Sequence, residues 1–159
     1  MITIVTGKIN EGKTTLLKQI YDDRKQGDGF VSIKKMDGSR VHSFTATKLS
    51  SEEQKILLLH DHFYSESFLS AGKMGPYFIN LLTISWIEKS IEKMIEDKVE
   101  PIFLDEVGMF EIRGYGYDRI LRKMIDSKLD IIFTTRTEFL DQVKKHYQLK
   151  DVKVISVSK

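Results

Sequence analysis

Hydrophobic and polar positions follow two spacings along the chain, one typical of strands and one typical of helices. Apolar, β-branched runs predict strands at residues 2–6, 101–106, 131–135 and 152–157. Apolar positions three or four residues apart predict helices at residues 13–21, at about 78–97, at 117–125, and over Leu140, Val143 and Tyr147. Strands and helices that alternate in this way favour an α/β fold of three layers, with a mainly parallel sheet and helices on both faces.

The region after the first helix departs from this alternation. Residues 30–33 and 40–47 read as strands around a turn at 36–39, and a short apolar run at 56–59 can continue them. We predict an antiparallel β insert at roughly residues 28–62. A loop is predicted at residues 72–77, before the long helix begins.

Composition limits the class of protein. The 159 residues are 41% hydrophobic and 30% charged, which is ordinary for one globular domain, predicted at residues 1–159. The chain has no cysteine, no secretory signal pattern and no apolar run near the roughly 20 residues that cross a bilayer. We expect a cytoplasmic monomer without a membrane partner. A net charge of +2 gives no argument for nucleic acid.

The segment between the first strand and the first helix fits the pattern G-x-x-x-x-G-K-[ST]. Gly7 and Gly12 allow backbone angles that turn successive N–H groups toward phosphate oxygens. Lys13 supplies charge for the β- and γ-phosphates, and the Thr14 hydroxyl can ligate Mg²⁺. The predicted nucleotide-binding residues are Gly7, Lys8, Ile9, Asn10, Glu11, Gly12, Lys13, Thr14 and Thr15.

Two carboxylates, Asp105 and Glu106, end the strand predicted at residues 101–106. Beside a phosphate loop, an aspartate at this place holds Mg²⁺, and a carboxylate one residue later can deprotonate the attacking water. Adjacent residues of an extended strand point to opposite sides, so the two can have separate roles. We predict Thr14 and Asp105 as metal ligands, and Lys13 and Glu106 as catalytic residues.

Arg136 follows the strand at residues 131–135, where ligand-facing residues gather in parallel sheets. We count it as catalytic, stabilising charge on the γ-phosphate; a surface salt bridge is an equal alternative. Thr135 to Glu138 reads as a capping box that opens the last helix. Thr134 or Thr135 could instead sense the γ-phosphate.

Other candidates have a plainer structural reading. Arg113 could act as a mobile finger, although an exposed loop arginine is the default. His60 and His62 suggest metal ligands but lack a third partner, so we expect a structural role. Four aromatic residues could wall a base pocket, with core packing as the default: Phe63, Tyr64, Phe68 and Tyr77.

Four segments together carry a resemblance. They are G-K-T-T at residues 12–15, a Gly-Phe step at 29–30, D-E-[IV]-G-x-[MF]-E at 105–111, and a strand running into T-x-[HR] at 134–136. In this order they resemble the small nucleoside-triphosphatase family known from thermophiles, which includes the human cancer-related nucleoside-triphosphatase. The resemblance implies slow, Mg²⁺-dependent hydrolysis of ATP, GTP and other nucleoside triphosphates to diphosphate and phosphate, with broad base tolerance. It also makes Glu111 a candidate to support the catalytic water or a neighbouring base.

The chain departs from this family at two places. Met109 stands where members commonly carry lysine, and residues 8–11 replace small residues usual in the loop. Glu11 puts a negative charge near the phosphates, which is unfavourable unless it points outward or pairs with Lys8. Two other functions stay open. A kinase would use the same loop with an acceptor pocket and a lid, and a nucleotide-dependent binding module would use hydrolysis only to reset a conformation.

Overall fold

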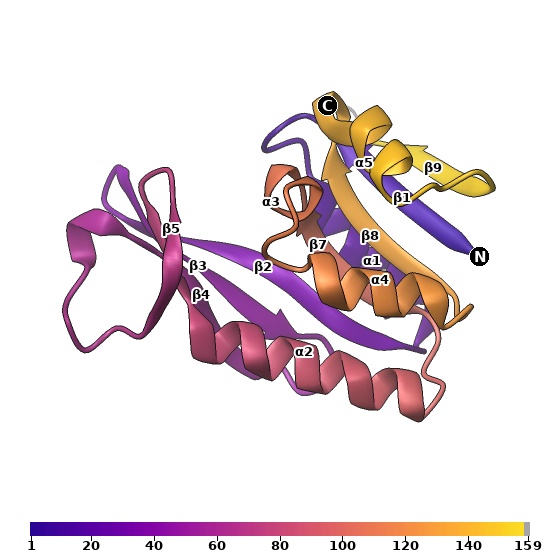
Figure 1. Cartoon of the computed structure of the whole chain (residues 1–159), viewed down its shortest axis with the longest axis horizontal. Helices are drawn as coiled ribbons and strands as arrows, with labels where there is room; N and C mark the ends of the chain where they lie inside the picture. The colour runs from indigo at the N-terminus through magenta and orange to yellow at the C-terminus, as the bar shows by residue number, and fades with distance from the viewer. Residues whose placement is uncertain (158–159) are drawn as a thin grey trace.

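The computed structural model describes residues 1–157. Their strands form one nine-stranded sheet of order β5-β6-β4-β3-β2-β7-β8-β1-β9 (Figure 1). The strands are β1 (Ile2–Gly7), β2 (Asp28–Asp37), β3 (Arg40–Lys48), β4 (Gln54–His60), β5 (Ser70–Met74), β6 (Tyr77–Asn80), β7 (Ile102–Val107), β8 (Ile131–Arg136) and β9 (Val152–Ser156). The helices are α1 (Lys13–Arg24), α2 (Leu81–Glu96), α3 (Met109–Ile112), α4 (Asp118–Asp126) and α5 (Leu140–His146), with 3-10 turns η1 (Asp61–Phe63) and η2 (Thr137–Phe139).

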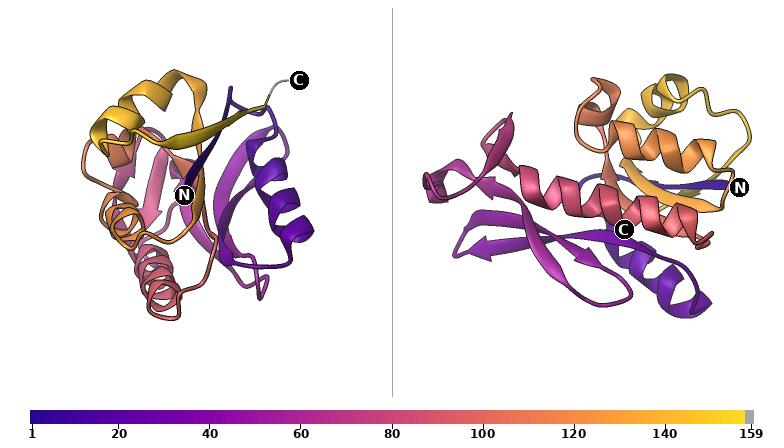
Figure 2. Two further views of the ribbon diagram at one scale, coloured as in Figure 1. Left: turned by 90° about the vertical axis from the view of Figure 1, so that its right-hand side faces the viewer. Right: turned by 60° about the horizontal axis from the view of Figure 1, so that its bottom comes forward.

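Five neighbouring strands, β2, β7, β8, β1 and β9, run parallel and form the body of the molecule. Side chains alternate between the two faces of these strands, as the strand period requires. Val5, Phe103 and Ile132 face α1, whereas Ile4 and Phe133 belong to the larger core beneath α2, α4 and α5. Figure 2 shows α1 on one side of the sheet and the other helices opposite. The three-layer α/β fold is therefore confirmed, with a sheet that is parallel in its core.

The antiparallel part is larger than predicted. β3, β4, β6 and β5 extend the sheet beyond β2 and project from the body as an arm, at the left of Figure 1. Antiparallel pairing therefore continues to Asn80 rather than stopping near residue 62. The predicted loop at residues 72–77 is wrong, because β5 and β6 form a hairpin around Gly75 and Pro76.

The long helix α2 begins at Leu81 and not at Phe78, as the apolar spacing suggested. Phe78 pairs with Leu59 of β4, so pairing within the sheet overrides the helical pattern there. Asn80 is the N-cap, and its side-chain oxygen accepts hydrogen bonds from the N–H groups of Leu82 and Thr83. The expected end of the helix near Asp97 is confirmed.

The predicted capping box at Thr135 is also wrong. Thr135 belongs to β8, pairs with Thr6, and is 1% exposed. The chain then forms η2, and α5 begins only at Leu140, after Phe139 and without a side-chain cap. Pairing on both sides of β8 holds Thr135 in the strand, which a local capping pattern cannot show.

The parallel strands end at one edge of the sheet. Gly7 pairs with Arg136, and Thr135 pairs with Val107, so β1, β7 and β8 finish side by side. Ligands of open α/β sheets bind at this edge. Within residues 1–157, none of the helices has both the length and the apolar composition that crossing a bilayer requires.

Candidate functional site

Two glycines and the side chain of Lys13 fix the loop between β1 and α1. Gly12 precedes α1 in a left-handed conformation, with φ 91°, which glycine adopts without strain. A side chain at Gly7 would lie 3.0 Å from the carbonyl oxygen of Val157, so this position is tightly packed. The ammonium group of Lys13 donates a hydrogen bond of 2.7 Å to the carbonyl oxygen of Lys8 and is thereby held over the loop.

Glu11 neither points away from the loop nor pairs with the Lys8 ammonium group. Its carboxylate accepts a hydrogen bond of 2.9 Å from the backbone N–H of Lys8. The side chain also lines the cleft beside the loop. The negative charge that the sequence placed near the phosphates therefore lies at the cleft.

Asp105 is buried at the end of β7 and accepts three hydrogen bonds. The donors are the Thr14 hydroxyl at 2.7 Å, the Ser32 backbone N–H at 2.9 Å and the Thr134 hydroxyl at 2.6 Å. Burial raises the pKa of Asp105, while these donors and the charge of Lys13 oppose the rise. The hydrogen bond from Thr14, in the first turn of α1, to Asp105, in β7, thus links the two predicted metal ligands.

Glu106, the next residue, has an unusual backbone. Its φ is 69°, a left-handed conformation that non-glycine residues adopt at a cost. The pairing of β7 with β8 shifts register between Leu104 and Val107, so a bulge contains both carboxylates. The expectation of a regular strand with two opposed side chains is therefore wrong in its detail. The two still separate, because Asp105 is buried and Glu106 is exposed to the cleft.

The surroundings of Glu106 favour its protonated form. The surrounding protein atoms partly desolvate the Glu106 carboxylate even though its side chain is open to the cleft, and this raises its pKa; the charge of Asp105 raises the pKa further. Lys13 and Arg136 act in the opposite direction. A carboxylate with a raised pKa is a stronger base toward water than an ordinary surface glutamate.

Thr134 connects the two carboxylates. Its hydroxyl donates to Asp105 and accepts a hydrogen bond of 2.8 Å from the backbone N–H of Glu106. The residue is fully buried, so its hydroxyl bonds to other groups of the protein and not to solvent. Sequence reasoning considered Thr134 only as a γ-phosphate sensor, and it missed Ser32 altogether. No local signal marks Ser32, because its N–H reaches Asp105 through the pairing of β2 with β7.

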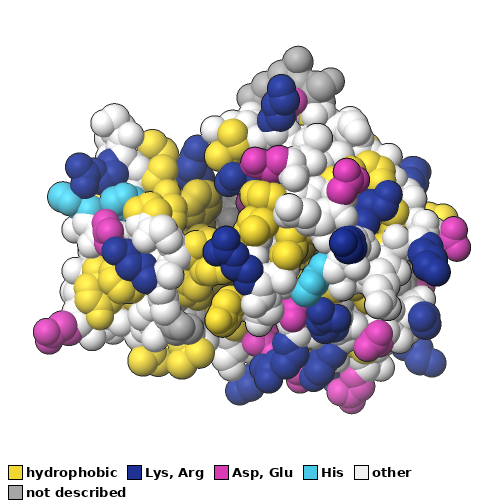
Figure 3. All heavy atoms as spheres, turned by 45° about the horizontal axis from the view of Figure 1, so that its top comes forward, with side chains coloured by type: hydrophobic (Ala, Val, Ile, Leu, Met, Phe, Trp, Pro, Cys, Tyr) yellow, Lys and Arg dark blue, Asp and Glu magenta, His cyan; other side chains and the backbone are white. Residues whose placement is uncertain are grey.

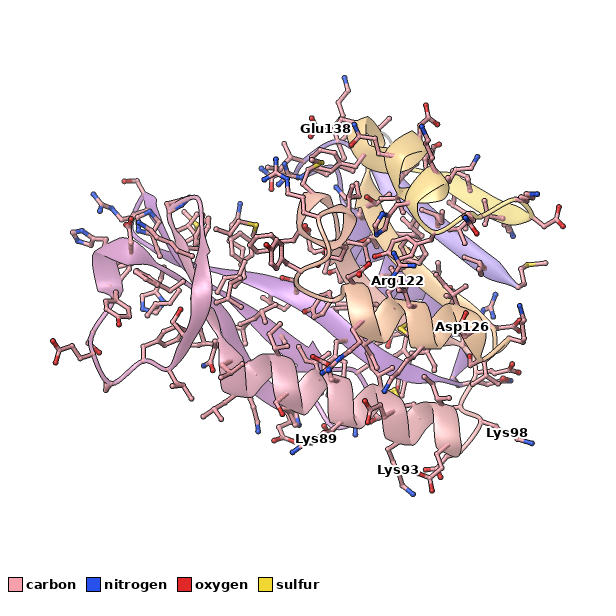
Figure 4. All side chains as sticks on the ribbon, viewed as in Figure 1. Lys89, Lys93, Lys98, Arg122, Asp126 and Glu138 are labelled. Atoms are coloured by element: carbon pink, nitrogen blue, oxygen red, sulfur yellow. The ribbon has the colours of Figure 1, made fainter. Side chains whose placement is uncertain are left out.

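Arg136 ends β8 at the mouth of the site. Its guanidinium lies 3.7 Å from the carboxylate of Glu138, which is 65% exposed and is labelled in Figure 4. An ion pair so long and exposed contributes little. Arg136 also lines the cleft with Glu106. The salt bridge of the second alternative is therefore present, and the catalytic role of Arg136 stays a prediction.

A cleft of about 940 Å³ runs along these groups. The loop, the first turns of α1 and the middle of β2 form its walls, with Glu106, Arg136 and Val157 at its borders. Two residues that the sequence did not indicate, Lys34 and Gln19, also line it. Lys34 lies 3.4 Å from the side-chain oxygen of Asn10 and adds a positive charge near the loop.

Three of the weaker candidates, Arg113, His60 and His62, lie away from the cleft. Arg113 is exposed and lines neither this cleft nor its neighbour. His60 accepts a hydrogen bond from the N–H of His62 and so caps η1. Residues 1–157 contain no cluster of three histidine, cysteine, aspartate or glutamate side chains suited to a metal.

The proposed aromatic wall is mostly elsewhere. Phe63 packs against His42, and Tyr64 stacks on Phe78 with ring centroids 4.2 Å apart. Phe68 contacts Tyr64. Only Tyr77 of the four predicted residues lines a cavity near the site. These aromatic side chains pack the arm, in agreement with the plainer reading.

Comparison with known proteins supports the three-layer α/β fold and the family resemblance that the sequence indicated. A model of the NTPase family matches residues 2–159. The chain is 27% identical to nucleoside-triphosphatase THEP1 of Thermotoga maritima over 159 residues, which cover 99% of this chain and 87% of the relative. The crystal structure of THEP1 from Aquifex aeolicus is similar with a TM-score of 0.72 and 21% identity, over 99% of this chain and 90% of that one. The solution structure of a human cancer-related nucleoside triphosphatase has a TM-score of 0.65 and 20% identity, over 99% and 88%. The chain belongs to the NTPase family.

Proposed function

We propose that the protein hydrolyses nucleoside triphosphates to the diphosphate and phosphate, with Mg²⁺, slowly and with broad base tolerance. The observation that carries this proposal is the hydrogen bond of 2.7 Å between Thr14 and Asp105, with Glu106 next in the chain and facing the cleft. It brings the phosphate loop, two candidate oxygen ligands and a candidate base to one edge of the sheet. The relatives named above are nucleoside-triphosphatases by name, which favours the same reaction.

The oxygen atoms of Thr14 and Asp105 fit a small, hard cation. Neighbouring ligands of an octahedral Mg²⁺ lie about 2.9 Å apart, given bond lengths of about 2.0–2.1 Å. The two oxygens here are 2.7 Å apart. Bound Mg²⁺ would neutralise charge on the β- and γ-phosphate oxygens.

Three parts of the chain act on the substrate. The loop amides and Lys13 bind the phosphates and stabilise the charge that develops on the β–γ bridge and γ-oxygens. Glu106 takes a proton from the water that attacks the γ-phosphorus, and Arg136 stabilises the same transition state. To act in this way, Lys13 exchanges the Lys8 carbonyl oxygen for phosphate oxygens.

Two features support slow turnover and broad base tolerance. The cationic side chains of Lys13, Lys34 and Arg136 share the site with the carboxylates of Glu11, Asp105 and Glu106, so little net positive charge remains for the phosphates. Past the loop, the cleft offers Leu16, Gln19 and Val157, which give few hydrogen bonds to tell one base from another.

Phosphate release from ATP, GTP, CTP and UTP, measured with Mg²⁺ and again with a chelator, tests this proposal. We expect turnover of all four, which the chelator abolishes. The Lys13→Ala variant should lose turnover. The Lys18→Ala variant, changed at an exposed position on the same helix, should retain turnover. Release from a single nucleotide would contradict broad tolerance, and release in the presence of chelator would contradict the metal requirement.

A further inference from the structure

A second cavity of about 480 Å³ adjoins the phosphate cleft. It lies where the arm meets the body, and Figure 3 shows the hollow there with hydrophobic side chains around it. The arm contributes Leu57, Leu58 and Ile79, and the body contributes Met109, Phe110 and Phe139. A mainly apolar cavity of this size, with a few polar groups, is typical of small-molecule sites.

Glu106 and Arg136 line both cavities, as do Ser32 and Phe44. A molecule in the second cavity therefore faces the carboxylate and the guanidinium that a γ-phosphate faces from the cleft. The other acid of this cavity, Glu111, is already engaged: its carboxylate accepts hydrogen bonds from the backbone N–H groups of Gly108 and Tyr117. Glu106 is the carboxylate left to interact with a ligand, since its side chain makes no hydrogen bond within residues 1–157.

Hydrolysis does not account for this volume. One water molecule takes about 30 Å³ and needs two to four polar partners. Most of the second cavity offers apolar walls instead, so ordered water is poorly held there beyond the place beside Glu106. The shape and chemistry of the space suit an organic body.

The nucleotide base is not the occupant that this geometry favours. The amides of a phosphate loop hold the α- and β-phosphates, whereas the lysine and the metal ligands hold the γ end. Here the γ end lies toward Lys13, Thr14 and Glu106, next to the second cavity. Leu16 and Gln19, which line the cleft alone, mark the way out for the nucleoside.

We propose that the second cavity binds a small, mainly apolar molecule with one hydroxyl group, and that this hydroxyl accepts the γ-phosphoryl group in place of water. The inference rests on the proposed function, because it uses the same triphosphate site and the same base. The acceptor oxygen forms a bond to the γ-phosphorus as the bond from that phosphorus to the β–γ bridging oxygen breaks. The hydroxyl proton goes to Glu106, and the products are a phosphate ester and the nucleoside diphosphate.

The test uses the full chain with ATP, Mg²⁺ and one of three alcohols at equal concentration: 2-phenylethanol, cyclohexylmethanol or glycerol. Phosphorus NMR measures the phosphate ester and inorganic phosphate together. We expect esters of the two apolar alcohols, exceeding the glycerol ester by at least about tenfold, which is the discrimination that apolar pocket contacts provide.

Two substitutions fill the cavity from opposite sides, Met109→Trp in the body and Met74→Trp in the arm. Each should lower the ratio of ester to inorganic phosphate by at least about tenfold. The matched control is Met36→Trp, which changes an exposed methionine that lines neither cavity and should leave the ratio unchanged.

Each result decides between the two proposals. Phosphate release without ester from either apolar alcohol overturns the acceptor site and leaves hydrolysis standing. Inhibition by these alcohols that competes with ATP, again without ester, assigns the cavity to the nucleotide and also overturns it. An ester yield that is equal with glycerol, or unchanged in both filled variants, removes the cavity from the reaction. Ester formation with no phosphate release in plain buffer contradicts the proposed hydrolysis alone.

Discussion

The hydroxyl of Thr134 holds both acidic residues of the site in place. It donates to Asp105 and accepts from the N–H of Glu106, whose left-handed backbone needs such support. Thr134 touches no reacting atom, so it acts as a positioning residue.

Replacing Thr134 by valine keeps the shape of the side chain and removes both hydrogen bonds. Because the backbone of Glu106 then loses the hydrogen bond that supports its left-handed conformation, we expect kcat to fall by about tenfold or more, with a smaller change in KM. Steady-state phosphate release measures this split. Thr134→Ser keeps the hydroxyl and should recover most of the rate; an unchanged kcat in Thr134→Val would contradict a positioning role.

Glu11 acts in the opposite sense, because its charge lies at the cleft that binds phosphates. Glu11→Gln removes the charge, while the amide oxygen can still accept the N–H of Lys8. One unit of charge a few ångströms away is worth about 1 kcal/mol in water, so nucleotide affinity should rise about fivefold. Isothermal titration calorimetry at low and high salt measures the nucleotide affinity, and the difference between the variant and the wild type should be smaller at high salt. Weaker binding by the variant would show that Glu11 supports the loop more than it repels phosphate.

The sequence predicted which residues meet at the site better than it predicted their geometry. Short sequence patterns identify two of them: a glycine-rich loop precedes Thr14, and an apolar run ends at Asp105. The structure brings the two side chains together. The bulge at Glu106 could not be predicted, since it arises from the pairing of β7 with β8. The same applies to Ser32, whose N–H reaches Asp105 from another strand.

Among the secondary-structure elements, α3 and the turn that follows it depend on one buried acid. The carboxylate of Glu111 accepts N–H groups from Gly108, before α3, and from Tyr117, before α4. A side chain at Gly116 would overlap this carboxylate, so the turn needs glycine there. Glu111 therefore fixes the segment that lines the second cavity, and its suggested support of the catalytic water or a neighbouring base stays a prediction.

This buried acid predicts how stability depends on pH. Burial raises the pKa of Glu111 from 4.5 to about 7, against its hydrogen bonds to backbone N–H groups. Between these values the folded chain keeps a proton that the unfolded chain releases, so this contribution is full below pH 4.5 and is lost as the pH rises to about 7. The loss is about 3 kcal/mol. Urea unfolding of the wild type should therefore give a lower free energy of unfolding at pH 7.5 than at pH 5.

Glu111→Gln provides the control, since its amide does not titrate. The variant is expected to be less stable at pH 5, because the amide nitrogen cannot accept the second N–H. Its free energy of unfolding should nevertheless change less between the two pH values than that of the wild type. An equal change in both proteins would assign the pH dependence to other groups.

The long, regular elements of the body were predictable because each has a continuous apolar pattern. The β5–β6 hairpin was not, because Gly72, Gly75 and Pro76 read as loop residues and the strands are stabilised by pairing with β4. The predicted start of the long helix was wrong for the same reason, because Phe78 pairs within the sheet. Contacts distant in sequence decide such short segments.

At the scale of the whole molecule, the arm projects from the body (Figure 1). The body holds the phosphate loop and both acids, and residues of the arm line one side of the second cavity. The two parts share one continuous sheet, in which β2 pairs with β7 on one side and with β3 on the other. Gly29 allows close contact at this junction, since a side chain there would overlap the backbone of Phe103. The sheet thus sets the arm at a fixed place beside Glu106.

The central claim is that Glu106 activates the nucleophile, and Glu106→Gln tests it most directly. The measurement is phosphate release with Mg²⁺ and ATP at saturation, beside the dissociation constant for ATP and a control variant, Glu66→Gln, at an exposed position on the arm. We predict that Glu106→Gln binds ATP about as well as the wild type and loses at least about a hundredfold in turnover, as the removal of a general base does. Release at the wild-type rate would contradict the account, because some other group would then have to take the proton from water.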